Sequence, residues 1–292
     1  MRSPIDTVQT SRAPVMLCVG AVTLDRYGQN LVPGGCVTYA AMTWKELGGE
    51  ARVLTTCGED FPAGRLGLGS GIHVVRKDRT TVFANEYDST GRRTQFVEAQ
   101  PGMLRPKDLP GEWEEPDVLF LGPVLGECDV AEWCDETGFI TAVGLQGLMR
   151  RAREDAEAAK VEPKALDTES GWWRRVHYAF LSKEDQQAQP GLALELAGKV
   201  PTVVLTDRQN GCEVFDRTAR FRVGVYPVEC VDPTGAGDTF AAGFLWARLN
   251  GMDSCEAARF GAACASVVVE GLATEALAGM KQLVWDRYER VR

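Results

Sequence analysis

The sequence predicts an α/β fold in which a mainly parallel sheet carries helices on both faces. Short runs rich in Val, Leu and Cys alternate with segments of helical periodicity, and this alternation is typical of parallel sheets covered on both sides. The chain has 292 residues, 45% hydrophobic and 25% charged, an ordinary globular composition that is long enough for a large core. No apolar stretch reaches the length that crosses a membrane, so no membrane partner is expected.

The apolar runs that we expect to form buried strands are Val15–Ala21, Arg52–Thr56, Val118–Leu121, Phe139–Val143, Val176–Leu181 and Thr202–Thr206. The helical patterns are Thr38–Leu47, Gly191–Lys199, Thr239–Asn250 and Asp253–Val269. The last of these begins with Asp-Ser-Cys-Glu, which is similar to a capping box. A further strand is expected at Tyr226–Cys230, directly before a glycine-rich turn.

Two polar segments interrupt this rhythm. Asp25–Gly35 ends in Gly-Gly, and Val74–Ala99 alternates with period two around a Ser-Thr-Gly turn. Such alternation predicts an antiparallel hairpin with one face in water. We interpret residues 25–35 and 74–99 as a small β lid, with a static surface hairpin as the alternative. The highly charged segment Arg150–Ser170 is expected to be a solvated helix or loop.

Charge and cysteine usage narrow the function classes. The net charge is −9 and no basic run occurs, so the chain lacks the electrostatic footprint of a nucleic-acid partner. Nine cysteines are scattered without a C-x-x-C pair, which removes the usual zinc and redox spacings and favours a reducing, cytoplasmic location. Residues 1–13 are polar, unlike a signal peptide, and are expected to be a flexible leader before a single domain, 14–292.

The most informative stretch is VDPTGAGDTF, Val231–Phe240. The first N–H groups of a helix have no intrahelical partner, and the helix dipole adds positive charge there. Glycines before a helix let an anion approach the backbone, so the turn predicts an anion site. Asp238, in the first helical turn, should be ionised and is suited to take a proton from a hydroxyl that attacks a phosphate. A plain capping aspartate is the alternative.

DPTGAGDTF resembles the C-terminal signature of the PfkB (ribokinase-like) carbohydrate kinase family, whose core is D-x-T-G-A-G-D. Asp232, Thr234 and the run from Gly235 to Asp238 match its fixed positions. Residues from about Val15 to Gly271 follow the family's order of features. The resemblance implies a ribokinase-like three-layer α/β/α core with a mainly parallel central sheet and a small β lid.

The resemblance also implies roles for individual residues. The catalytic base would be Asp238, and the anion hole would be the backbone of Gly235, Ala236 and Gly237. The residues that would bind the acceptor are Asp25, Gly34 and Gly35, together with Tyr39. Tyr39 stands close to the place of a common family asparagine, which implies altered substrate selection.

ATP and Mg²⁺ are the cofactors that the resemblance implies, and a monovalent cation site near Asp232 stays open. The segment LTDRQNGCEVF is similar to the family's T-x-G-x-x-G, with Thr206 and Gly211 matching and Arg208 in place of the middle glycine. The other residues assigned to the nucleotide are Thr234, Ala262 and Ala265. The two alanines fit close helix packing equally well.

Two departures from the family pattern stand out. The family's N-x-x-E is replaced by SKED, where Ser182 lacks the amide and Asp185 keeps a carboxylate for a magnesium contact. The segment around Gly67–Gly71 is short for the helix that the family usually has there.

We expect ATP-dependent phosphorylation of a hydroxyl of a small sugar or cyclitol. A nucleoside or ribose kinase and a non-catalytic sugar-binding relative are the alternatives, and a homodimer through the lid strands stays open.

Overall fold

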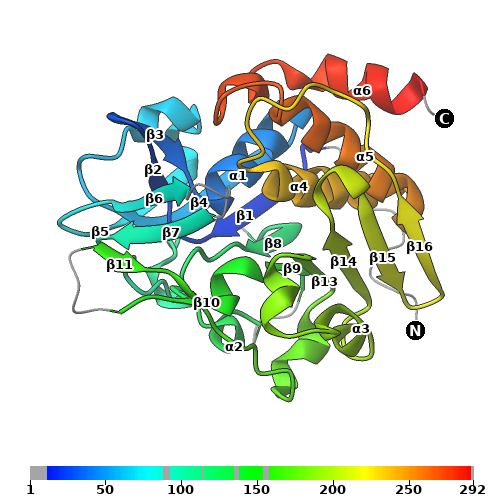
Figure 1. The fold of residues 1–292 in the computed structure, drawn as a ribbon, viewed down its shortest axis with the longest axis horizontal. Helices are drawn as coiled ribbons and strands as arrows, with labels where there is room; N and C mark the ends of the chain where they lie inside the picture. The colour runs from blue at the N-terminus through cyan, green and yellow to red at the C-terminus, as the bar shows by residue number, and fades with distance from the viewer. Residues whose placement is uncertain (1–11, 88–92, 114, 135–137, 154–157, 291–292) are drawn as a thin grey trace.

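The computed structural model describes residues 12–87, 93–113, 115–134, 138–153 and 158–290 (Figure 1). Most of the expected leader, and the Ser-Thr-Gly turn of the expected hairpin, lie outside the described residues. Within those ranges, no helix combines the length and the apolar character that a membrane crossing requires.

A nine-stranded sheet forms the centre of the molecule, in the order β16-β15-β14-β13-β9-β8-β1-β4-β5. From β14 to β5 all neighbouring strands are parallel, whereas β15 and β16 are antiparallel additions. The strands are β1 Val15–Val19, β4 Glu50–Cys57, β5 Ile72–Arg76, β8 Val118–Leu121, β9 Ile140–Gly144, β13 Tyr178–Ser182, β14 Thr202–Thr206, β15 Cys212–Asp216 and β16 Ala219–Val223. Every strand expected from the apolar runs is confirmed, except the one before the glycine turn.

Helices cover both faces of this sheet, which makes a three-layer α/β/α core (Figure 1). One face carries α1 Cys36–Leu47, α4 Ala236–Leu249, α5 Ser254–Val268 and α6 Met280–Arg290, and the other carries the short helices α2 Val130–Trp133 and α3 Leu192–Ala197. The four expected helices are confirmed as α1, α3, α4 and α5. The capping box at the start of α5 is also present, with Asp253 accepting from the backbone of Cys255 and Glu256.

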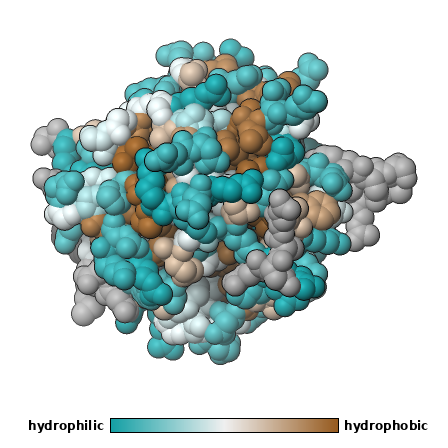
Figure 2. Space-filling view, turned by 90° about the vertical axis from the view of Figure 1, so that its left-hand side faces the viewer, coloured by the Kyte–Doolittle hydropathy of each residue, from teal (hydrophilic) through white to brown (hydrophobic). Residues whose placement is uncertain are grey.

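A separate five-stranded sheet, in the order β11-β7-β6-β2-β3, stands at one end of the core. Its strands are β2 Thr23–Tyr27, β3 Asn30–Gly34, β6 Thr81–Tyr87, β7 Arg93–Glu98 and β11 Ala158–Lys160. We call it the lid sheet. The end of the molecule that carries it faces the viewer in Figure 2, where hydrophobic residues show as separate strips between hydrophilic ones.

The expectation for Arg150–Ser170 is wrong in its first half. This segment forms the two-residue strands β10 Arg150–Arg151 and β12 Glu162–Pro163, and β11 between them pairs with β7. Ala159 is buried with Phe83 and Val97 of the lid sheet. The backbone groups on the outer edge of β7 need partners, and a short strand meets that need without a hydrophobic signal of its own.

Two more boundaries differ from expectation. Tyr226–Cys230 does not form a strand. Pro227 has no N–H to donate to a neighbouring strand. The chain instead joins the end of α5, where Val231 N–H donates to the Val269 carbonyl (2.7 Å). The hairpin is antiparallel as expected but consists of β6 and β7, because Val74–Arg76 belongs to the core strand β5.

Only 3₁₀ turns at Ala63–Leu66 and Gly69–Gly71 lie between β4 and β5, so the predicted loss of a helix there is confirmed.

Candidate active site

The turn before α4 depends on one glycine for its shape. Gly235 has φ of 75°, in the left-handed region, and a Cβ there would lie 2.2 Å from the Tyr39 ring. The chain therefore needs a glycine both for its conformation and for the close approach of Tyr39. Gly237 differs, because it is exposed and a Cβ there would meet nothing within 4 Å. Open space thus lies beside the first turn of the helix, where N–H groups have no intrahelical partner.

Asp238 lies in the first turn of α4, as expected. Burial raises the pKa of its carboxyl to about 6, while a hydrogen bond from Cys36 and the charge of Arg150 lower it and the charge of Asp185 raises it. Burial is the largest of these effects, yet with a pKa of about 6 the carboxyl is mostly ionised at pH 7. A pKa just below the working pH is well suited to a general base.

Cys36 is a site residue that the sequence reasoning missed. Its thiol donates a hydrogen bond to the Asp238 carboxyl. The thiol also lies where Cβ atoms on Gly122 and Gly144 would come within 2.7 and 3.6 Å of its sulfur. These glycines stand just after β8 and at the end of β9, so Asp238 is located at the carboxyl edge of the sheet. The only sequence signal was a cysteine directly after Gly-Gly.

Asp25 and Gly34 come together across the β2–β3 pair. A Cβ on Gly34 would lie 2.2 Å from an Asp25 carboxylate oxygen, so the carboxylate rests on bare backbone. Burial raises the pKa of Asp25 to about 7, and the charges of Asp232 and Asp238 raise it further. A hydrogen bond from Thr23 and the charge of Arg150 act in the opposite direction and lower this pKa. The charges of both aspartates of the D-x-T-G-A-G-D motif thus act on the pKa of Asp25. Gly35, at φ 91°, is the N-cap of α1.

Asp232 connects the lid sheet to the glycine turn. Its carboxylate accepts hydrogen bonds from the Tyr27 hydroxyl (2.7 Å), the Thr234 N–H (2.9 Å) and the Ala273 N–H (3.0 Å). Burial opposes ionisation, but these bonds hold the pKa of Asp232 below its ordinary value. The Tyr27 hydroxyl is also 3.2 Å from the Thr234 hydroxyl. Tyr27 is a second residue that sequence reasoning missed, since nothing in a polar strand singles it out.

Tyr39 is fully buried beneath the glycine turn. Within the part of the chain that the structure describes, its hydroxyl has no hydrogen-bond partner. Burial raises the pKa of this hydroxyl, and the charge of Asp25 adds to the effect. Tyr39 therefore supports the turn, and its assignment to the substrate stays a prediction.

The residues expected to bind the nucleotide lie beside β14 and on α5. Thr206 ends β14 and its hydroxyl donates to the Leu181 carbonyl (3.3 Å). Gly211 has φ of 84°, and a Cβ there would lie 2.0 Å from the Val223 carbonyl oxygen, so this glycine is structurally required. Arg208 has φ of 47°, in the left-handed region that glycine adopts most easily. Its guanidinium binds Glu184 at 2.5 Å.

Ala262 is buried on α5, and Ala265 is half-buried one turn along. A Cβ on the neighbouring Gly261 would come within 2.8 Å of the Phe240 carbonyl oxygen of α4. Close packing of α5 on α4 thus accounts for that glycine. The assignment of the two alanines to the nucleotide stays a prediction.

Asp185 is held by Ser182 rather than by an asparagine. One Asp185 oxygen accepts from the Ser182 N–H (2.9 Å) and from its hydroxyl (2.6 Å). The described residues contain no group of three or more His, Cys, Asp or Glu side chains that could hold a metal ion. Magnesium is usually bound by one or two carboxylates together with phosphates and water. A single oriented carboxylate fits an ion that arrives with phosphate.

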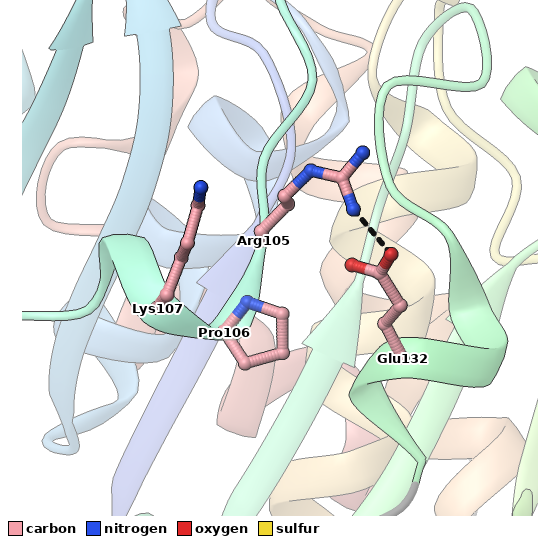
Figure 3. A pocket seen from close by; sticks show the side chains of 4 residues that line it. All are labelled: Arg105, Pro106, Lys107 and Glu132. Carbon is pink, nitrogen blue, oxygen red and sulfur yellow. Dashed lines mark hydrogen bonds and ion pairs between the residues drawn. The ribbon is translucent and has the colours of Figure 1, made fainter.

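A surface pocket lies apart from these motif residues. It is lined by Arg105, Pro106, Lys107 and Glu132, and the Arg105 guanidinium bonds to Glu132 of α2 (Figure 3). None of its lining residues belongs to the glycine turn or to the Asp25 pair. We therefore place the candidate site at the turn before α4.

A parallel sheet covered on both faces, with a glycine turn and a helix start at its carboxyl edge, is typical of α/β proteins that bind phosphates. Over residues 177–277 the sequence matches the family model described as pfkB family carbohydrate kinase. Residues 177–277, which include the DPTGAGDTF signature, are thus similar to this family.

Curated relatives include kinases of different acceptors. Inositol 3-kinase from Arabidopsis thaliana is 28% identical over 81% of this chain and 67% of its own length. Inositol 3-kinase from Oryza sativa subsp. japonica is 36% identical, over 38% of this chain and 29% of that protein. Fructoselysine 6-kinase from Escherichia coli strain K12 is 34% identical over 32% of this chain and 36% of its own length. The matched part thus spans from about a quarter to two thirds of the length of the first curated relatives.

Solved structures have the same fold. A sulfate complex of a pyrophosphate-dependent kinase in the ribokinase family has a TM-score of 0.77 at 19% identity, covering 90% of this chain and 99% of that one. Ribokinase from Thermotoga maritima has a TM-score of 0.69 at 19% identity, covering 94% and 99%. The expected ribokinase-like fold is confirmed.

Proposed function

We propose that the protein transfers a phosphoryl group from a donor to a hydroxyl of a small sugar or cyclitol. The observation that carries the proposal is the cluster of Asp25 with the glycine turn and Asp238, brought together from two parts of the chain. One half-buried carboxyl lies at a helix start with an open space beside it, and another half-buried carboxyl rests on the bare backbone of Gly34. Acceptor hydroxyls bind at Asp25 and Gly34, and one of them faces Asp238.

The residues of the chain have distinct tasks in this transfer. Asp238 takes the proton of the attacking hydroxyl. The backbone N–H groups of Gly235, Ala236 and Gly237 hold the negative charge that builds on the phosphoryl oxygens. The lid sheet, tied to the turn through Tyr27 and Asp232, keeps water from competing as acceptor.

We propose ATP as the donor, with Thr206, Gly211 and Thr234 near its phosphates and Ala262 and Ala265 beside its base. Asp185 would hold a magnesium ion, which supplies charge neutralisation between the phosphates when bound. A monovalent cation near Asp232 is a further part of this proposal. Pyrophosphate is the alternative donor, because a structure of the same fold is a pyrophosphate-dependent kinase.

The acceptor class is supported by the names of the relatives, which include inositol and fructoselysine kinases. A nucleoside kinase from Methanothermobacter thermautotrophicus is 36% identical over 30% of this chain and keeps nucleosides as the second candidate class. A reducing, cytoplasmic location is proposed because the nine cysteines are scattered without a C-x-x-C pair. A homodimer through the outer strands of the lid sheet is proposed as well.

The test is a matrix of donors and acceptors with the purified full chain. ATP or pyrophosphate, each with and without Mg²⁺, is combined with myo-inositol, neutral sugars and nucleosides, and phosphorylated product is measured. We expect product with myo-inositol or a sugar, and a loss of about 10²- to 10⁴-fold in kcat in Asp238→Asn. Donor turnover without an acceptor product, or full activity of Asp238→Asn, would contradict the proposal.

A further inference from the structure

Tyr27 belongs to none of the sequence motifs, yet its hydroxyl contacts two residues of the D-x-T-G-A-G-D motif. It is the last residue of β2, and it donates a hydrogen bond to the Asp232 carboxylate (2.7 Å). The Thr234 hydroxyl lies 3.2 Å from the same phenol oxygen. A phenol carries a single proton, so Thr234 is the donor in this second contact. The Tyr27 oxygen thus joins a carboxylate and a hydroxyl that lie two residues apart in the motif.

Asp232 connects Tyr27 to the backbone on two further sides. Asp232 is buried, and the oxygen that accepts from Tyr27 also accepts from the Ala273 N–H (3.0 Å). The other oxygen accepts from the Thr234 N–H (2.9 Å). The three donors come from the lid sheet, from the segment after α5 and from the glycine turn. A buried carboxylate depends on each of its hydrogen-bond donors, so loss of the Tyr27 hydroxyl also loosens the other two segments.

Tyr27 is the one connection of this kind between the lid sheet and the turn. Within the ranges that the structure describes, no other hydrogen bond or ion pair joins a strand of the lid sheet to residues 231–238. The lid sheet therefore acts on the turn through a single side chain.

Tyr27 also shares a strand with Asp25, the carboxylate assigned to the acceptor. Asp25 comes two residues earlier on β2, so both side chains point to the same face of the sheet and start about 6–7 Å apart. β2 is paired on both sides, with β3 along its whole length and with β6 from Thr23 to Arg26. A strand held in this way moves as one piece. The position of Asp25 is therefore tied to that of the glycine turn.

We propose that Tyr27 is a positioning residue, whose hydroxyl holds the glycine turn in register with the acceptor bound at Asp25. This inference rests on the proposed function. Tyr27 touches neither the acceptor nor the phosphoryl group. It acts through Asp232 and Thr234, which set the direction of the N–H groups that follow in the turn. Without this hydroxyl the acceptor still binds at Asp25, but the turn no longer holds the phosphoryl group in line with the attacking oxygen.

The decisive variant is Tyr27→Phe, which removes a single oxygen atom. Tyr178→Phe is the matched control, because the buried Tyr178 hydroxyl accepts a hydrogen bond from Arg248 Nε (3.2 Å). Tyr178 begins β13 and Arg248 lies in the last turn of α4, at the end of that helix away from the glycine turn. Thermal unfolding shows first that each variant is folded. If Tyr27→Phe does not fold, Tyr27→Gln takes its place with the same expectations.

Hydrogen exchange followed by mass spectrometry measures the turn without any ligand or turnover. The N–H groups of Val231, Asp232 and Thr234 are hydrogen-bonded in the structure. We expect exchange in residues 231–238 to rise by about tenfold or more in Tyr27→Phe, the usual effect of losing a hydrogen bond to a charged group. Exchange there should stay at the wild-type level in Tyr178→Phe.

Two further measurements separate positioning from a purely structural role. Inorganic phosphate, titrated by calorimetry, should bind to Tyr27→Phe about 3- to 10-fold more weakly than to the wild type. In turnover with myo-inositol or a sugar, kcat should fall by about 10- to 100-fold, since a small misplacement of reacting groups has a large effect. The acceptor KM should change little, because Asp25 is intact. A structural residue would lower the unfolding temperature and leave these values unchanged.

Equal exchange of residues 231–238 in the wild type and Tyr27→Phe overturns the inference, and so does an equal rise in Tyr178→Phe. It is also overturned if the wild type binds no phosphate, if Tyr27→Phe keeps the wild-type phosphate affinity, or if the acceptor KM rises without a fall in kcat. Exchange and phosphate affinity that depend on Tyr27, in a protein that phosphorylates no acceptor, refute only the proposed function.

Discussion

Replacing Gly235 with alanine should weaken the whole protein, because two costs combine at this position. The φ of 75° belongs to the left-handed region, which costs a residue with a Cβ about 1–2 kcal/mol. The new methyl group would lie 2.2 to 2.4 Å from three atoms of the Tyr39 ring. Tyr39 is fully buried, so it has little room to retreat, and overpacking of this kind costs about 1–3 kcal/mol. The free energy of unfolding should fall by about 2–5 kcal/mol.

Gly237→Ala is the matched control, two residues further along the same turn. A Cβ there meets nothing within 4 Å, and the residue lies in α4 with ordinary helical geometry. Alanine is favoured over glycine in a helix by roughly 0.5–1 kcal/mol, so the free energy of unfolding should stay level or rise. If the open space beside Gly237 receives the phosphoryl group, the same variant should lose turnover while keeping its stability.

Urea unfolding of the wild type and both variants, followed by fluorescence, gives the comparison. We expect a lower midpoint only in Gly235→Ala. Equal midpoints in all three proteins would refute the packing of Tyr39 against the turn. A drop in Gly237→Ala as large as in Gly235→Ala would refute the distinction between a structural and an open glycine.

Three further outcomes can be measured. The value of kcat/KM should fall as the pH drops below about 6, since the raised pKa of Asp238 leaves the base protonated there; a flat pH–rate profile would contradict its role. Cys36→Ala removes a hydrogen bond that lowers this pKa, so the acidic limb should move to higher pH, whereas Cys36→Ser should leave it near wild type. Glu127 is buried, and one of its oxygens accepts from the N–H groups of Ala21 and Val124 while the other accepts from Leu125 N–H (all 2.8 Å). Glu127→Gln replaces one of these oxygens by an amide group that faces an N–H donor, so it should cost about 1–3 kcal/mol in urea unfolding. An unchanged midpoint would show that the loops after β1 and β8 are held by other contacts.

The fold could be predicted from local patterns wherever a segment is buried on both sides. Continuous apolar runs such as Val118–Leu121 formed parallel strands, because such a strand must be hydrophobic on both faces. The pattern failed for β11, whose three residues pair with β7 without a hydrophobic run. It also failed for Tyr226–Cys230, which was expected to be a strand but belongs to no sheet. Edge pairing depends on what lies beside a segment, and this information is absent from the segment itself.

The chemical groups of the site were readable in the sequence, because a helix start after glycines is a local feature. Asp238, Gly235 and Gly237 belong to a turn whose predicted anion site follows from about ten residues of chain. Only the tertiary structure brought the Cys36 thiol and the charge of Arg150 to bear on Asp238, since Cys36 begins α1 and Arg150 begins β10. Burial, and with it the pKa of about 6 for Asp238, results from the packing of all these elements together, so no single stretch of sequence could determine it.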